Sequence, residues 1–208
     1  IMREILIKKA QLVNEGKVSQ KDLLIKGDKI EKIGNHLSIN GNEEIIDASG
    51  LYLLPGWIDD QVHFREPGLT HKATIATESR AAVAGGITSF IDMPNTNPQT
   101  TTQKALNEKL DLASNVSIAN YGFLFGGTND NLEEIRTLDV TQAAGLKLFL
   151  GSSTGNMLVD NEQVLKKIFS ITDLPIAVHC EDENIIRKNL AEQIAKYGGE
   201  IPIEKHPE

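Results

Sequence analysis

From Pro55 onward, the sequence alternates short apolar segments with helix-like segments, and this alternation constrains the fold more than any other feature. Between and after the apolar segments lie stretches with the spacing of amphipathic helices, among them NLEEIRTLDVTQAA (131–144). Regular alternation of this kind predicts a parallel sheet covered by helices, either an open doubly wound sheet or a (β/α)8 TIM barrel. The apolar segments are GWIDDQVHF, GITSFIDMP, SIANYGFLFG, GLKLFLGSS and LPIAVHCED.

Residues 1–54 have a different pattern, with short strand-like runs separated by Asn-Glu-Gly, Gly-Asp and Asn-Gly turn sequences. We expect this segment to form an all-β unit. The composition suits a folded protein with a real core, at 40% hydrophobic and 24% charged residues over 208 positions.

Bulk charge and cysteine content narrow the classes of partner and compartment. A net charge of -8 and a pI near 5.2 argue against binding to nucleic acid or to an anionic membrane surface. Cys180 is the only cysteine in the sequence, so it has no partner for an internal disulfide, and a cytoplasmic location is expected. No apolar run approaches the roughly 18 to 20 residues that span a bilayer.

Polar residues follow the predicted strands at the edge where α/β proteins place their active sites. No GxGxxG or GxxxxGK[ST] sequence follows a strand, which weakens the nucleotide-binding interpretation of an open sheet and favours the barrel. About five of the eight βα units of a barrel can be counted. These polar residues are His63, Arg65, Asn95, Lys147, His179 and Glu181.

The densest polar cluster is in LLPGWIDDQVHFREPG, residues 53–68. If the strand alternates regularly, Asp59, Gln61, His63 and Arg65 share one face. A strand inside a parallel sheet is usually apolar on both faces, so a polar face must bind something or take part in a hydrogen-bond network. A network would suffice for one histidine, whereas the whole cluster favours a binding site.

Lys147 lies within GLKLFLG, where burial would favour loss of its proton. A neutral amine reacts with carbon dioxide to give a carbamate, which is an anionic metal ligand. The alternatives are a lysine that reaches the rim of the barrel or one that holds a substrate anion. With His63 and His179 at equivalent strand ends, Lys147 suggests a zinc site, and Cys180 is expected to be a small core residue.

The segments PGWIDDQVHFREPGLTHK (55–72), AGGITSFIDMPNTNP (84–98), GLKLFLG (145–151) and AVHCED (177–182) together resemble the dihydroorotases, cyclic amidohydrolases of pyrimidine biosynthesis. The resemblance implies a metal-dependent TIM barrel in residues 55–208 and part of a small β-sandwich domain in residues 1–54. It further implies reversible hydrolysis of (S)-dihydroorotate to N-carbamoyl-L-aspartate in the synthesis of UMP. One or two Zn²⁺ ions, a homodimer and association with aspartate carbamoyltransferase are also implied.

By match to the motifs of this family, His63, Lys147 in N-carboxylated form and His179 resemble metal ligands. Arg65 and Asn95 resemble the pair that holds the substrate carboxylate, for which Arg offers a planar bidentate fork. Allantoinases usually carry Asn where this chain has Arg65, so the resemblance favours a substrate with a free carboxylate.

The chain departs from the family pattern at Gln61, which replaces the first histidine of a His-x-His pair. An amide oxygen is a poorer zinc ligand than imidazole. One metal is therefore expected to be weakly held, differently ligated or absent, with Gln61 and Asp59 as doubtful ligands or supporting groups. The family's general-base Asp falls in strands beyond residue 208, so residues 1–208 alone are predicted to be inactive.

Two other functions remain open at this point. The first is a non-catalytic dihydroorotase-like scaffold subunit for aspartate carbamoyltransferase, for which the loss of a ligand at Gln61 is an argument. The second is a related amidohydrolase that acts on another carboxylated cyclic amide or imide. The metal content of the protein would separate the first from an enzyme, and the role of Arg65 in substrate binding would test the second.

Overall fold

A computed structural model describes residues 3–38, 41–151 and 156–205. The chain divides into two compact units, Ile1–Gly56 and Trp57–Glu208.

The first unit is a five-stranded sheet in which the strands run in the order β3-β2-β1-β4, with β5 also paired to β1. Strands β1 and β2 form an antiparallel hairpin closed at Glu15 and Gly16, both of which have positive φ angles of 48° and 72°. The strands are β1 (Glu4–Asn14), β2 (Lys17–Lys26), β3 (Lys29–Gly34), β4 (Glu44–Asp47) and β5 (Tyr52–Leu53).

Asp22 holds an irregular part of this sheet together. The register of β1 against β2 shifts between Ile7 and Ala10, and Lys9 within the shift has a φ of 60°. The buried carboxylate of Asp22 accepts the backbone N–H of Lys9 at 2.8 Å and that of Leu37 at 2.9 Å. These bonds lower the pKa of Asp22, the one from Lys9 most strongly.

The second unit contains the predicted parallel sheet, with the strands in the order β10-β9-β8-β7-β6 and every neighbouring pair parallel. A doubly wound sheet reverses its strand order at a switch point, whereas a barrel keeps consecutive strands adjacent. The consecutive order therefore confirms the barrel type, here as a partial barrel. The strands are β6 (Trp57–Val62), β7 (Ile87–Asp92), β8 (Asn120–Gly126), β9 (Gly145–Phe149) and β10 (Ile176–His179).

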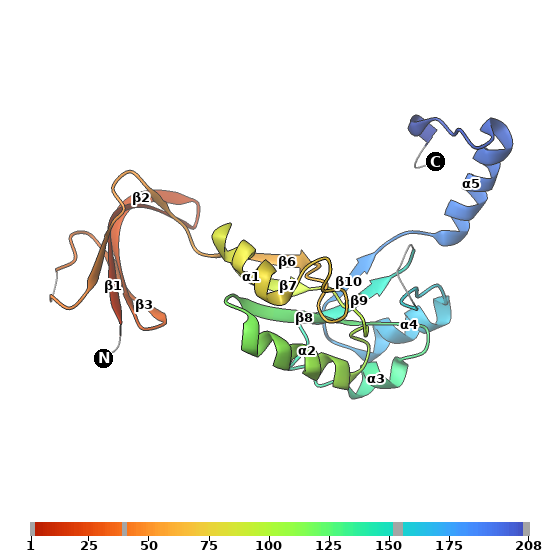
Figure 1. The fold of residues 1–208 in the computed structure, drawn as a ribbon, viewed down its shortest axis with the longest axis horizontal. Helices are drawn as coiled ribbons and strands as arrows, with labels where there is room; N and C mark the ends of the chain where they lie inside the picture. Colours follow the sequence, from red (N-terminus) through yellow and green to blue (C-terminus); the bar gives the residue numbers. More distant parts are fainter. Residues whose placement is uncertain (1–2, 39–40, 152–155, 206–208) are drawn as a thin grey trace. The chain divides into compact units, whose positions relative to one another are not determined.

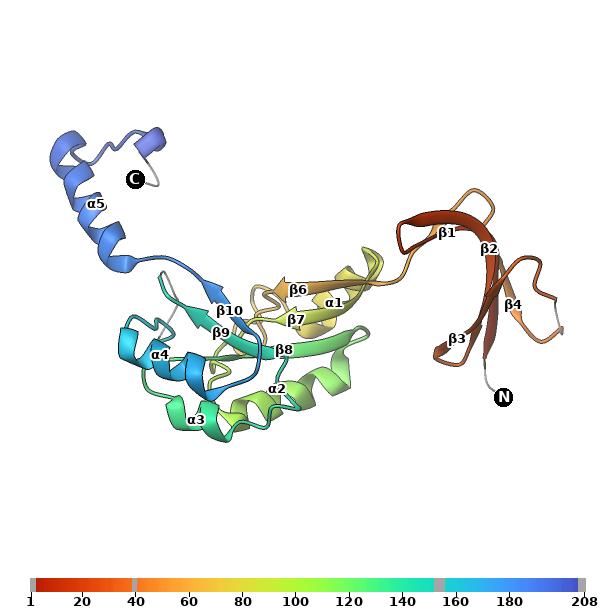
Figure 2. The same cartoon turned by 180° about the vertical axis from the view of Figure 1, so that it is seen from behind.

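Helices follow the strands, and Figures 1 and 2 show α2, α3 and α4 along the same side of the sheet. Threonine, asparagine or aspartate side chains cap α1, α2, α4 and α5 by accepting backbone N–H groups of the first turn. The helices are α1 (Ile75–Ala84), α2 (Gln103–Val116), α3 (Leu132–Thr137), α4 (Glu162–Ile171) and α5 (Glu183–Tyr197).

The core of this unit lies between the sheet and the helices. Leu146 and Leu148 of β9 pack in one buried cluster with residues from α1 to α4, whereas Lys147 between them faces the opposite side of the sheet. Because β10 is in register with β9, Ala177 pairs with Lys147 and His179 with Phe149 on that second face. One face of the sheet therefore packs against helices, and the other carries the polar residues. The helix residues in the cluster are Ile75, Leu106, Ala113, Ile135 and Ile168.

Helix α3 is shorter than the helix-like stretch from Asn131 to Ala144 suggests. It ends at Thr137, and Leu138 is already extended at φ -59° and ψ 133°. Asp139 then accepts the backbone N–H of Thr141 at 3.0 Å and its hydroxyl at 2.7 Å. This local turn competes with helix formation, as short polar side chains commonly do.

Helix α5 exposes several large apolar side chains, among them Ile185, Leu190 and Ile194. Across residues 3–38, 41–151 and 156–205, no helix combines the length and apolarity needed to cross a membrane.

Candidate functional site

The side chains that the sequence indicates for the site come from the carboxyl ends of four strands. His63 directly follows β6, Asn95 lies three residues after β7, Lys147 is in β9, and His179 is the last residue of β10. In a parallel sheet these ends lie at one edge.

His63 and Asn95 are joined directly, with His63 Nδ1 at 2.9 Å from Asn95 Oδ1. A carboxamide oxygen only accepts, so Nδ1 carries the proton and Nε2 keeps its lone pair. Burial, followed by the positive charge of Arg65, lowers the pKa of His63, although the bond to Asn95 acts in the opposite direction. The lowered pKa favours the neutral imidazole, which is the form that ligates metals.

The two loops that carry these residues are locked together. The backbone N–H of Asn97 donates to the carbonyl of Pro67 at 3.1 Å. Gly68 has a φ of 81°, and a Cβ at this position would collide with the carbonyl oxygen of Asn97 and lie 2.7 Å from Asn97 Cβ. Glycine is thus required here on two grounds, the backbone conformation and the close approach of the second loop.

Arg65 is half-buried beside His63 and has a φ of 68°, which is unusual for a residue with a side chain. Its backbone carbonyl accepts the N–H of Leu69 at 3.1 Å. Among residues 3–38, 41–151 and 156–205, its guanidinium has no ion-pair or hydrogen-bond partner. It is therefore free to bind an external anion.

Lys147 is buried, with 4% of its surface exposed, as the sequence predicts. Its Nζ lies 5.2 Å from the centre of the Phe149 ring, and within the described part of the chain it has no hydrogen-bond or ion-pair partner. Burial lowers the pKa of Lys147. Its charge in turn contributes to the lowered pKa of His63, so the two side chains interact electrostatically.

His179 is more open than the other candidates, with 49% of its side chain exposed. Its Nε2 lies 3.4 Å from Glu181 Oε1, and its ring centre is 6.4 Å from that of Phe149. Glu181 packs against Gly151, where an added Cβ would collide with the Glu181 side chain. Cys180 directly follows β10 and is exposed in this structure, so its assignment to the core is wrong for this chain.

The structure places Asp59 and Gln61 differently from what a regularly alternating strand predicts. The register of β6 against β7 shifts between Asp59 and Val62, which pair with Phe90 and Asp92 respectively. The extra residue in β6 breaks the shared face that was expected for Asp59 and His63. Asp59 accepts the backbone N–H of the exposed Gln61 at 3.1 Å.

A metal would find two imidazoles and one amine at this edge, from His63, His179 and Lys147. In the described ranges, no group of three or more His, Cys, Asp or Glu side chains is arranged to hold a metal ion. The unpartnered, buried Lys147 fits conversion to a carbamate, which would add oxygen ligands to the imidazoles. The donor types of these residues match part of a zinc site, which would need further ligands.

Comparison with known proteins identifies the family. The sequence profile described as "Amidohydrolase family" matches residues 52–201. The chain belongs to the amidohydrolase family.

Named relatives of this amidohydrolase include the dihydroorotase of Methanosarcina acetivorans, 36% identical over 99% of this chain and 44% of that protein. The dihydroorotase of Lactococcus lactis is 40% identical over 88% of this chain and 43% of that protein. The chain thus spans less than half the length of these relatives. The L-hydantoinase (dihydropyrimidinase) from Arthrobacter aurescens has a similar fold, with a TM-score of 0.87, 28% identity and coverage of 99% of this chain and 48% of that one.

Two residues of this amidohydrolase that the sequence did not single out are Asp92 and Lys109. Their side chains form an ion pair with Nζ to Oδ2 at 2.6 Å, and both are fully buried. A signal was available for each of them. Asp92 is a lone charge in the apolar segment GITSFIDMP, and Lys109 falls at the helical spacing of the buried residues Leu106 and Ala113.

Proposed function

We propose that the whole protein is a dihydroorotase, which hydrolyses (S)-dihydroorotate reversibly to N-carbamoyl-L-aspartate. The observation that carries the proposal is the unpartnered guanidinium of Arg65 beside the bonded pair of His63 and Asn95. Relatives named dihydroorotase, which match nearly all of the chain, support it. Because the chain spans only part of their length, the activity is proposed for the whole protein.

Arg65 and Asn95 are proposed to bind the carboxylate of the substrate. Since His63 occupies Asn95 Oδ1, the amide N–H groups of Asn95 remain to donate to an anion. The planar guanidinium of Arg65 adds a bidentate contact. Together they would fix the ring of a carboxylated cyclic amide relative to the neutral imidazole of His63.

Zinc is the metal we propose for this site, held by Nε2 of His63, by His179 and by Lys147 as its carbamate. When bound, such a metal would supply Lewis-acid polarisation of the amide carbonyl. The bond from Nδ1 of His63 to Asn95 would orient the imidazole toward the metal, as a hydrogen bond to the second ring nitrogen commonly does.

The decisive experiment is the steady-state kinetics of the whole enzyme carrying Arg65→Met. We expect the KM for dihydroorotate to rise at least about tenfold, because a charge-assisted bidentate contact is lost. Arg80→Met is the matched control, since Arg80 is exposed on α1 and its guanidinium donates a hydrogen bond to the Ala76 carbonyl of its own helix. An unchanged KM in the Arg65 variant would point to another substrate.

The second candidate function is a non-catalytic scaffold for aspartate carbamoyltransferase. It is favoured by Gln61, which is exposed and bonds through its backbone to Asp59 in the place where the resemblance expects a histidine ligand. Zinc analysis of the whole protein separates the two, because a scaffold would lack stoichiometric metal. The homodimer, the association with aspartate carbamoyltransferase and the cytoplasmic location stay predictions.

A further inference from the structure

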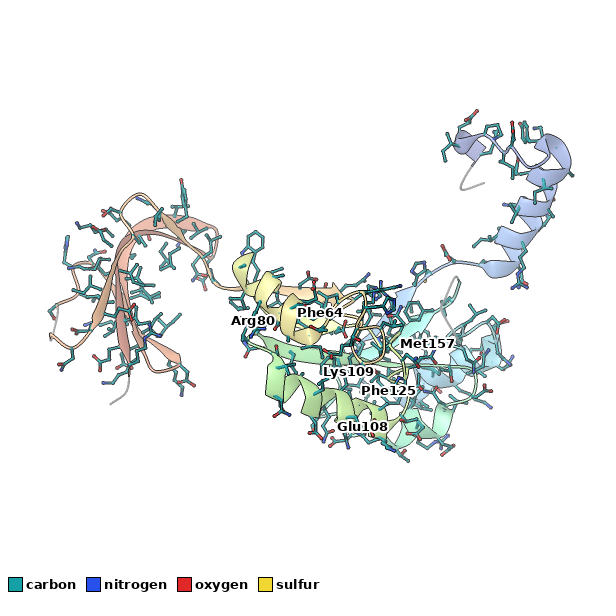
Figure 3. The ribbon with its side chains drawn as sticks, in the orientation of Figure 1. Phe64, Arg80, Glu108, Lys109, Phe125 and Met157 are labelled. Atoms are coloured by element: carbon teal, nitrogen blue, oxygen red, sulfur yellow. The ribbon has the colours of Figure 1, made fainter. Side chains whose placement is uncertain are left out.

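Lys109 reaches from α2 into the core of the second unit. Its Nζ lies 2.6 Å from Asp92 Oδ2, donates to the backbone carbonyl of Met93 at 3.0 Å and stands 4.8 Å from the centre of the Phe123 ring. Figure 3 shows Lys109 on the sheet side of α2, whereas Glu108 points away from the sheet. A lysine on a helix thereby contacts the last residue of β7 and the residue after it.

The other carboxylate oxygen of Asp92 points toward the neighbouring strand. Asp92 Oδ1 accepts the backbone N–H of Phe64 at 2.8 Å, and the Phe64 ring lies 4.4 Å from that of Phe90. The backbone N–H of Met93 donates to the carbonyl of Val62 at 3.0 Å. A single buried carboxylate therefore ties the end of β6 to the end of β7 and to α2.

The bonded backbone positions lie next to the candidate site residues. Phe64 stands between His63 and Arg65, and Met93 is two residues before Asn95. The bond between His63 and Asn95, at 2.9 Å, joins the same pair of loops. A shift of the Phe64 backbone would displace both its neighbours.

Stability alone does not account for a pair of this kind. Two charges removed from water lose hydration that their attraction only partly replaces, and apolar pairs of similar volume are often as stable or more so. Burial lowers the pKa of Lys109 while Asp92 opposes this, which reflects that cost. What an apolar pair lacks is an oxygen for the N–H of Phe64.

We propose that Asp92 and Lys109 are positioning residues, which fix the backbone of the loops after β6 and β7 so that His63, Arg65 and Asn95 hold one relative arrangement. The inference rests on the proposed function only for what those three side chains bind. The positioning itself is a property of the 208-residue chain and is tested without activity.

The test compares Asp92→Leu/Lys109→Met with Lys104→Met/Glu108→Gln, in which an exposed ion pair of the same helix is removed. Amide hydrogen exchange reports on Phe64, two-dimensional ¹⁵N NMR of the imidazole reports the tautomer of His63, and urea unfolding reports stability. In the buried-pair variant we expect a folded chain whose unfolding midpoint changes little, because removal of two buried charges offsets the loss of an acceptor for the Phe64 N–H. We also expect Phe64 exchange to be faster by at least about tenfold, and mixed His63 tautomers. The exposed-pair variant should match the parent in all three.

A folded buried-pair variant with unchanged Phe64 exchange and a single His63 tautomer would overturn the inference. If this variant does not fold, Asp92→Asn/Lys109→Met keeps an oxygen near Phe64 and should show the same changes, smaller in size. Should both variants fail to fold, the pair serves stability and the inference is again overturned. If the whole protein proves not to be a dihydroorotase, these results still stand, because none of them measures activity.

Discussion

Gly68→Ala is expected to loosen the contact between the two loops that carry the candidate site. The new methyl group would meet the Asn97 carbonyl in a backbone already at φ 81°. We expect about 1–2 kcal/mol for the left-handed conformation, partly offset by ~0.4–1 kcal/mol from a stiffer unfolded chain. Overpacking adds about 1–3 kcal/mol, and loss of the bond from Asn97 to Pro67 adds ~0.5–1.5 kcal/mol. The free energy of unfolding should therefore fall by about 1.5–6 kcal/mol.

Gly86→Ala is the matched control for this prediction. Gly86 has a φ of 88°, and an added Cβ would meet no atom within 4 Å, so only the conformational cost applies. Urea unfolding of both variants against the parent chain measures the difference, which is the cost of the loop contact. Equal losses in the two variants would refute the close packing of Gly68 against Asn97 as a source of stability.

Three further outcomes are expected from urea unfolding. Asp22→Asn should cost about 1–3 kcal/mol, because the buried carboxylate accepts two backbone N–H groups. These bonds, most strongly the one from Lys9, lower the pKa of Asp22 in the folded chain. Their contribution to stability should therefore be present above pH 3.8, the ordinary pKa of Asp, and should be lost as the pH falls through the lower pKa of the folded state. The Asn variant should lack this pH dependence. Leu148→Ala should cost about 2–5 kcal/mol because Leu148 is fully buried, and a loss below ~1 kcal/mol would contradict that packing. Lys104→Met should change stability by less than ~0.5 kcal/mol, since its ion pair with Glu108 is exposed; a larger loss would show a role for it in folding.

The barrel-type sheet was predictable because its signal is local and repeated. Each strand is an apolar run bounded by turn residues, and the helices between them have polar outer faces and capping residues. The end of α3 at Thr137 was not predictable from periodicity, because the Asp139 turn competes with a helix that the same residues could continue. The exposure of Cys180 depends on which strands lie beside β10, a long-range property.

The candidate site was predictable where polar side chains gather at the end of a predicted strand. His63, Asn95 and Lys147 could be selected by residue type and position, and the structure joins the first two and buries the third. The shift of register near Asp59 could not be predicted, because a bulge leaves no mark in the composition of a strand. Lys109 illustrates a further limit, since its partner lies 17 residues earlier in a different kind of element.

The division of the sheet into a helix-packed face and a polar face has a consequence for how this protein can change over evolutionary time. Leu146 and Leu148 point to the core and Lys147 points to the polar face. Substitutions at alternate residues of β9 are therefore limited by packing at some positions and by binding at the others. Variation on the polar face can alter what is bound without disturbing the core. Asp92 is the exception, because its two oxygens serve both demands at once, and it should tolerate far fewer replacements than its neighbours in β7.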